Sequence, residues 1–112
     1  MRAIKIEMNM QFEREVMVKK EIYEIDMKNE DTAFKLFSQQ LNLTKAKNKG
    51  HPTALIEQEV QTLKREIELN YTKKAALQRQ LADLEKDRNK HLEDFQQETL
   101  EQEIEALDVL YN

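Results

Sequence analysis

Residues 56–84 read IEQEVQTLKREIELNYTKKAALQRQLADL, and this stretch decides the fold class that the sequence predicts. Apolar side chains recur in it at alternating steps of three and four residues, which places them on one face of a long helix. Such a face needs a partner helix, because an amphipathic helix gains most of its stability from packing. Thr53 to Asn112 contains neither glycine nor proline, the two residues that most disfavour a helix interior.

The spacing assigns two seam positions, a and d, in each heptad. We expect the helix–helix seam to consist of Ile56, Val60, Leu63, Ile67, Asn70, Lys74, Leu77, Leu81 and Leu84. Beta-branched residues at the first a positions, with leucine at most d positions, favour a parallel homodimer. The polar residues Asn70 and Lys74 are expected to lower stability and to fix register or oligomeric state. The alternative is an amphipathic helix packed in a monomeric bundle.

The apolar spacing changes at Glu85–His91, where every residue is polar. Apolar residues return eleven residues after Leu81 and Leu84, which is typical of a stutter in a continuous coiled coil. The alternative is a turn near Asn89, which would give an antiparallel helical hairpin. Beyond this point the apolar residues form a stripe in a shifted phase, namely Leu100, Ile104, Leu107 and Tyr111.

The N-terminal residues follow a different period. In residues 3–12 the apolar residues alternate with polar ones, at Ile4, Ile6, Met8, Met10 and Phe12. A period of two predicts a half-buried strand. The parity of the apolar residues switches near Lys20, which we interpret as a turn or bulge between two strands within residues 3–27. A helical interpretation also stays open for the second segment, since Val18, Ile22 and Ile25 are four and three residues apart.

A polar break at Lys28–Thr32 contains residues that cap helices, so a short helix is expected over about residues 32–42. Its apolar face would be Phe34, Phe37 and Leu41, packed on the strands, because an isolated hairpin is marginal in water. Residues 44–52 contain the single glycine and the single proline of the chain and are predicted to be a linker.

The predicted organisation is therefore an N-terminal module of strands and a short helix over residues 1–43, a linker over 44–52 and a long helix over 53–112. The long helix is either a continuous coiled coil or is broken near residues 86–91 into a helical hairpin. The fold class is mostly α, with α+β as the alternative.

Composition limits the classes of function. There is no cysteine, which excludes disulfides and thiolate chemistry, and the two histidines, His51 and His91, are too few for a metal site. We expect no enzyme activity, no cofactor and no metal. No apolar run approaches the ~20 residues of a membrane span, and Met1–Lys5 lacks the apolar core of a signal peptide, so a soluble, cytoplasmic protein is expected.

The net charge of −4 is unevenly distributed. Residues 91–112 contain no lysine or arginine, and the residues that we expect to bind a partner there are Glu93, Asp94, Glu98, Glu101, Glu103, Glu105 and Tyr111. An acidic amphipathic helix is suited to a basic groove. Lys45, Lys47 and Lys49 form a small basic cluster, for which a solubilising linker is favoured over nucleic-acid binding.

The function that these features favour is a non-enzymatic interaction module that dimerises through the 56–84 seam and presents surfaces to a protein partner. The alternative is an acidic helical inhibitor that occupies the basic, nucleic-acid-binding cleft of a target protein. A second alternative is weak nucleic-acid binding through Lys45, Lys47 and Lys49.

Overall fold

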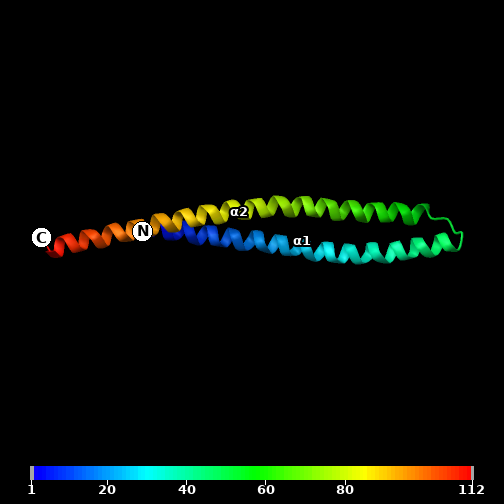
Figure 1. The fold of residues 1–112 in the computed structure, drawn as a ribbon, viewed down its shortest axis with the longest axis horizontal. Helices are drawn as coiled ribbons and strands as arrows, with labels where there is room; N and C mark the ends of the chain where they lie inside the picture. Colours follow the sequence, from blue (N-terminus) through cyan, green and yellow to red (C-terminus); the bar gives the residue numbers. More distant parts are fainter. Residues whose placement is uncertain (1, 112) are drawn as a thin grey trace. The chain divides into compact units, whose positions relative to one another are not determined.

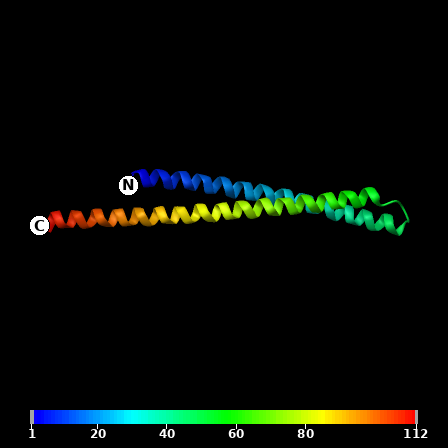
Figure 2. The same ribbon diagram turned by 90° about the horizontal axis from the view of Figure 1, so that it is seen from above.

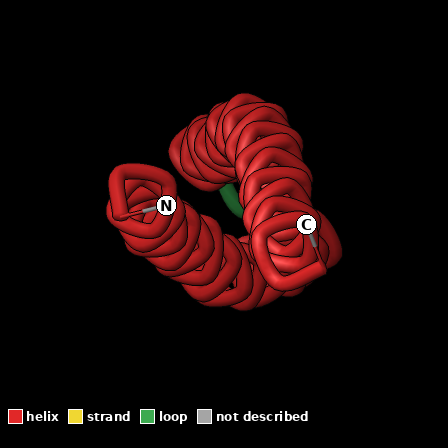
Figure 3. Tube along the Cα trace, turned by 90° about the vertical axis from the view of Figure 1, so that its left-hand side faces the viewer, coloured by secondary structure: helices red, strands yellow, loops and turns green. Residues whose placement is uncertain are grey.

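The computed structural model describes residues 2–111, which form two long helices (Figure 1). Helix α1 spans Arg2–Asn48 and helix α2 spans Ala54–Tyr111. Figure 3 draws helix throughout these residues, apart from the loop that joins α1 to α2. The described chain is all-α, which confirms the mostly helical class. Met1 and Asn112, the end residues of the predicted N-terminal module and of the predicted long helix, lie outside the described residues.

The connection between the helices is a glycine-terminated helix end. The amide of His51 donates to the carbonyl of Ala46 at 2.9 Å, and the amide of Gly50 donates to the carbonyl of Lys47 at 3.1 Å. Gly50 has φ +69°, so these two bonds form the Schellman motif that commonly ends helices. Pro52 follows, and the carbonyl of Thr53 accepts the first hydrogen bond of α2, from Glu57 at 2.9 Å.

The chain divides into two compact units, each of which contains part of both helices. The hairpin unit, Lys20–Gln78, contains the turn. In it, the Gln39 Nε2 donates to Glu59 Oε2 at 2.6 Å. Farther from the turn, the Lys74 Nζ lies 2.6 Å from Asp26 Oδ1. The residue number falls on α2 as it rises on α1, so the two helices pack antiparallel in this unit.

The core of the hairpin unit is a seam with heptad spacing on both helices. On α1 the buried and half-buried residues at steps of three and four are Ile22, Ile25, Asn29, Thr32, Leu36, Gln39, Leu43 and Ala46. On α2 they are Ile56, Val60, Leu63, Ile67, Asn70, Lys74 and Leu77. Knobs-into-holes packing requires this spacing. The seam is therefore an antiparallel coiled coil formed within one chain.

The terminal unit, Met1–Lys19 with Arg79–Asn112, is a second antiparallel pair. Arg88 pairs with Glu15 and His91 with Glu7, again in opposite chain directions. The seam residues here are Met8, Gln11, Glu15 and Val18 on α1 and Leu81, Leu84, Arg88, His91 and Phe95 on α2. In Figures 1 and 2 the last turns of α2 continue past the first described turn of α1.

The predicted strands of residues 3–27 are wrong, because this segment belongs to α1. Successive alternate residues in a helix are about 200° apart, so apolar residues on two opposite faces also produce a period of two. Met8 lies half-buried in the seam, whereas Ile6 and Met10 lie on the exposed face. The helical interpretation of Val18, Ile22 and Ile25 was the correct one, since all three lie in the seam.

Three other predicted features differ from the structure, namely the polar break, the short helix and the linker. The polar break at Lys28–Thr32 is helical, and Asn29 and Thr32 within it are buried in the seam. The predicted short helix over 32–42 is a part of α1, and Phe34, Phe37 and Leu41 are exposed rather than packed on strands. The predicted linker shortens, because α1 continues to Asn48.

The turn considered near Asn89 is absent, since α2 is helical from Ala54 to Tyr111. The antiparallel hairpin forms at Lys49–Thr53 instead. The stutter is also wrong: the seam keeps its steps of three and four through Leu84, Arg88, His91 and Phe95. The polar run did not shift the seam, because Arg88 and His91 have acidic partners on α1.

Candidate protein-interaction surfaces

The residues predicted to form an oligomer interface lie in the seam between α1 and α2. Val60 and Leu63 are buried, and the remaining seven are half-buried, namely Ile56, Ile67, Asn70, Lys74, Leu77, Leu81 and Leu84. The sequence pattern therefore identified the packing face of α2. It did not identify the helix that covers this face, which is α1 of the same chain.

This placement bears on the predicted parallel dimer. In the structure, Leu63 and Val60 are already shielded from solvent by α1. A second chain could bind the same face only if α1 moved away from it, at the expense of the apolar contacts that α1 makes. Dimerisation through residues 56–84 stays a prediction, and it competes with the packing inside the chain.

One polar layer of the seam consists of two asparagines in the hairpin unit. The Asn70 Nδ2 donates to Asn29 Oδ1 at 2.9 Å, and Asn29 is buried. The Nδ2 of Asn29 has no hydrogen-bond partner among the described residues. A buried asparagine pair lowers stability but disfavours shifted alignments, in which each amide would face an apolar layer. Asn29 and Asn70 therefore fix the register of α1 on α2.

Another polar layer consists of Glu15 and Arg88 in the terminal unit. The Nη1 of Arg88 lies 3.2 Å from Oε1 of Glu15, which is the most deeply buried large side chain described. Neither carboxylate oxygen of Glu15 has a hydrogen-bond partner of good geometry among the described residues. The contact is therefore an ion pair held mainly by opposite charge. Glu15 would be costly to bury without that charge beside it.

The predicted partner-binding residues lie on the last turns of α2. Five of them are exposed acids, namely Glu93, Asp94, Glu101, Glu103 and Glu105. Glu98 is half-buried, and Tyr111 is 81% exposed. Every residue from Leu100 to Tyr111 is exposed. Six of the seven predicted residues are therefore exposed to solvent.

This segment also has an apolar face. Leu100, Ile104, Leu107 and Tyr111 are four, three and four residues apart, so they share one side of α2, and all are at least half exposed. At about 100° per residue, Glu103 flanks one edge of this stripe and Glu101 flanks the other. We call residues 100–111 the acidic end of α2. Its apolar stripe and acidic edges are those of an amphipathic docking helix.

A further exposed apolar stripe, which the sequence analysis did not assign to a binding surface, follows the outer face of α1. In the hairpin unit it contains Tyr23, Met27, Phe34, Phe37 and Leu41, all of them exposed. We call this set the outer stripe. Its members are four, seven, three and four residues apart, so the sequence already contained the spacing of a second helical face. The sequence pattern instead predicted that Phe34, Phe37 and Leu41 pack on strands and that Tyr23 and Met27 belong to a strand.

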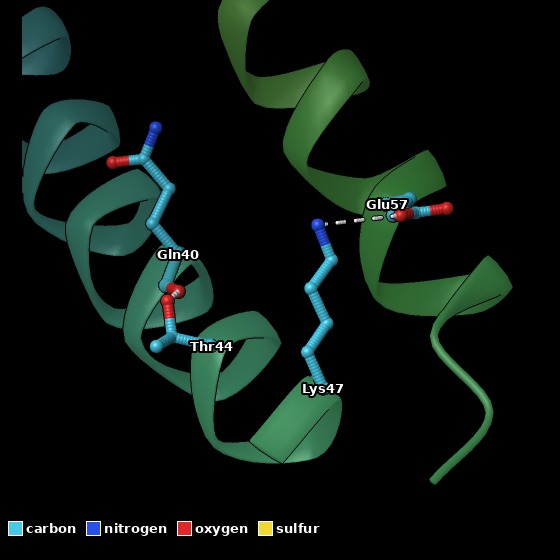
Figure 4. A network of polar contacts seen from close by, with 4 residues as sticks. All are labelled: Gln40, Thr44, Lys47 and Glu57. Carbon is cyan, nitrogen blue, oxygen red and sulfur yellow. Dashed lines mark hydrogen bonds and ion pairs between the residues drawn. The ribbon is translucent and has the colours of Figure 1, made fainter. Parts of the chain in front are cut away.

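Two of the three lysines in the small basic cluster lie at the end of α1. Lys45 and Lys47 lie in the last turn, where cations interact favourably with the helix dipole. The Nζ of Lys47 lies 3.9 Å from Glu57 Oε1 across the turn, while Thr44 donates to the Gln40 carbonyl at 3.1 Å (Figure 4). Lys47 therefore has an acidic partner within the chain, and nucleic-acid binding through Lys45, Lys47 and Lys49 stays a prediction.

Within residues 2–111 no three His, Asp or Glu side chains are placed to hold a metal ion together. His91, one of the two histidines, instead lies 3.4 Å from Glu7 through its Nδ1. In the same part of the chain, neither helix contains an apolar stretch long enough to cross a bilayer.

The structure therefore offers two exposed apolar faces, the acidic end of α2 and the outer stripe of α1. Comparisons of the chain with known protein families, with curated proteins and with solved structures find no match.

Proposed function

We propose that this chain is a non-enzymatic protein-interaction module, in which a helical hairpin presents the acidic end of α2 to a protein with a basic, apolar groove. The single observation that carries the proposal is the exposure of Leu100, Ile104 and Leu107 on a helix that lacks lysine and arginine in this region.

The apolar stripe supplies the affinity in this proposal. Leu107 is 53% exposed, and Leu110 and Tyr111 are more exposed still. Removing such side chains from water on binding is favourable by about 25 cal/mol per Å² of apolar surface. A helix presents them at i, i+4 and i+7, which is how amphipathic helices fill grooves.

The acidic edges supply specificity. Glu101, Glu103, Glu105 and Asp108 surround the stripe without a nearby cation on the same segment. A groove lined with arginine or lysine would attract this helix over a distance of about one Debye length, ~8 Å at physiological salt. A neutral or acidic groove would be rejected by the same charges.

The experiment is affinity capture from the native host with three forms of the full chain. The first is the wild type, the second carries Ile104→Asp and Leu107→Asp, and the third carries Glu101→Gln, Glu103→Gln and Glu105→Gln. We expect the wild type to retain a basic protein that both variants lose. Binding of the purified protein should weaken as salt rises, because its charged component is screened.

A matched control neutralises three exposed acids elsewhere, at Glu13→Gln, Glu66→Gln and Glu68→Gln. It has the same net charge as the third form, so the captured protein should remain bound. Retention by all forms, or loss in the control as well, would refute the assignment to the acidic end.

The charge of this segment also favours a second candidate function, inhibition of a protein that binds nucleic acid. Residues 91–112 present acids without a single lysine or arginine, which resembles the charge of a phosphate backbone. In that case a DNA or RNA oligonucleotide should displace the captured protein from the chain. Displacement by sodium chloride of equal ionic strength, but not by the oligonucleotide, would retain the docking function and reject inhibition.

A further inference from the structure

We propose that the hairpin unit binds a second copy of itself through the outer stripe of α1, with the two α1 helices antiparallel and Phe34 of each copy against Phe37 of the other. This proposal does not depend on the proposed function, because it concerns a different face of a different helix.

The first support is the exposure of aromatic side chains in the middle of α1. Phe34 is 70% exposed and Phe37 is 59% exposed. They lie on the face of α1 opposite to the seam, which is occupied by Thr32, Leu36 and Gln39. A phenylalanine ring contributes a large apolar area when it is buried, so two adjacent exposed rings indicate an uncovered contact.

The second support is the spacing of the face. Glu30, Phe34, Phe37 and Leu41 are separated by steps of four, three and four residues, and this order is the same in both chain directions. A two-fold axis between Lys35 and Leu36 therefore superposes these four positions on themselves, with Leu41 opposite Glu30 of the second copy. It sets Phe34 opposite Phe37 of the second copy, and a face that contacts the same face of an identical chain gives a closed dimer.

The third support is charge complementarity, which selects a second copy over another occupant. Residues 21–31 contain five acids and one lysine, whereas residues 40–50 contain three lysines and no acid. The same two-fold axis places residues 21–31 of one chain opposite residues 40–50 of the other. Three of these charged groups have partners within their own chain, namely Asp26, Asp31 and Lys47. The other groups bring a net charge of −2 against +2 at each of the two ends of the dimer.

One ion pair in this arrangement is suited to a test. The axis places Glu24 of one copy opposite position 47 of the other, two residues from Lys45, and it generates the pair of Glu24 and Lys45 twice. Both residues are exposed and neither forms an ion pair among the described residues, unlike Asp26 and Lys47, which have partners on α2.

The experiment measures the dimer dissociation constant of the full chain by sedimentation, with charge-reversed variants. Glu24→Lys places two like-charged pairs in the dimer, and so does Lys45→Glu, so each variant should weaken the dimer by roughly tenfold. An equimolar mixture of the two variants restores both opposite-charge pairs in the heterodimer. The mixture, and a chain that carries both reversals, should dimerise about as strongly as the wild type.

Aromatic variants provide the second readout. Phe34→Asp should leave a monomer of unchanged helicity, since Phe34 makes few contacts within the chain. Phe12→Asp is the matched control, because Phe12 is exposed to a similar degree but lies in the terminal unit. It should leave the dimer unchanged.

The results that overturn the proposal are a wild type that remains monomeric at high micromolar concentration, or a dimer that neither Phe34→Asp nor the charge reversals weaken. A third result is also informative. If Phe34→Asp disrupts the dimer, but mixing the two charge-reversed variants does not restore dimerisation, the antiparallel two-fold arrangement is rejected. None of these results bears on the acidic end of α2, so failure of this proposal is distinguishable from failure of the proposed function.

Discussion

Arg88 of α2 lies 3.2 Å from Glu15 of α1, and the Glu15 side chain is 1% exposed. Arg88 belongs to the polar run Glu85–His91, where the sequence pattern predicts an interruption of the seam. The seam continues there because α1 supplies an acid at the layer where α2 supplies a base. A pair of opposite charges thus replaces a pair of apolar side chains.

The first prediction concerns this ion pair. Arg88→Met should lower the free energy of unfolding by about 1–3 kcal/mol, because it leaves the carboxylate of Glu15 buried without its counter-charge. The double variant Glu15→Leu, Arg88→Leu should be at least as stable as the wild type, since an apolar layer needs no desolvation of charge. Urea denaturation followed by far-ultraviolet circular dichroism measures both. A double variant as unstable as Arg88→Met would show that the destabilisation does not arise from the unpaired charge.

The asparagine layer gives the second prediction. Asn29→Leu combined with Asn70→Leu should raise the free energy of unfolding by about 1–3 kcal/mol, because it removes a buried amide whose Nδ2 is unpaired. The register should become less unique, since two leucines tolerate shifted alignments. The denaturation midpoint measures stability, and amide line widths in NMR measure the loss of a single register. A less stable double variant with sharp lines would contradict this role for Asn29 and Asn70.

A third prediction compares two leucines on the same helix. Leu63 is 9% exposed and lies in the seam, whereas Leu69 is 61% exposed. Leu63→Ala should destabilise the chain by about 2–5 kcal/mol through lost burial and the cavity left behind. Leu69→Ala should change stability by no more than about 0.5 kcal/mol. Both variants carry the same substitution on the same helix. Equal losses in the free energy of unfolding would therefore show that Leu63 does not lie in the seam.

The turn supplies the fourth prediction. Gly50 has φ +69°, and a Cβ at this position would have no heavy atom within 4 Å. The cost of Gly50→Ala therefore comes from the left-handed backbone alone and should be about 1–2 kcal/mol. Asparagine tolerates this conformation better, so Gly50→Asn should cost less than Gly50→Ala. Thermal or urea denaturation ranks the three chains, and an alanine variant as stable as the wild type would exclude the observed helix end.

Much of α2 was predictable from sequence, for a physical reason. Its seam from Ile56 to Leu84 is mostly aliphatic, so the steps of three and four residues are visible without knowledge of the partner. A linker before α2 was also predictable, because Gly50 and Pro52 are the two residues that most constrain a helix boundary. That the chain reverses direction there was not predicted.

The seam of α1 was not predictable in the same way. Five seam positions of α1 hold polar residues, namely Gln11, Glu15, Asn29, Thr32 and Gln39. The heptad spacing of α1 therefore cannot be recognised from apolar residues unless the partners on α2 are known. Exposed apolar residues on the outer face, such as Ile6 and Met10, added a second periodicity that imitated a strand. The helix that covers the α2 seam could not be predicted either. The a and d residues do not show whether the partner helix belongs to the same chain or to a second chain.

The central claim is that α1 covers the α2 seam within one chain, and a pair of introduced cysteines tests it most directly. The chain contains no cysteine, so Asn29→Cys combined with Asn70→Cys gives one possible pair, at a layer where two short side chains meet with Nδ2 of Asn70 2.9 Å from Oδ1 of Asn29. After mild oxidation, denaturing electrophoresis should show a monomeric, reductant-sensitive band of altered mobility at every protein concentration. Disulfide-linked dimers whose yield rises with concentration, without the intramolecular product, would contradict the antiparallel hairpin.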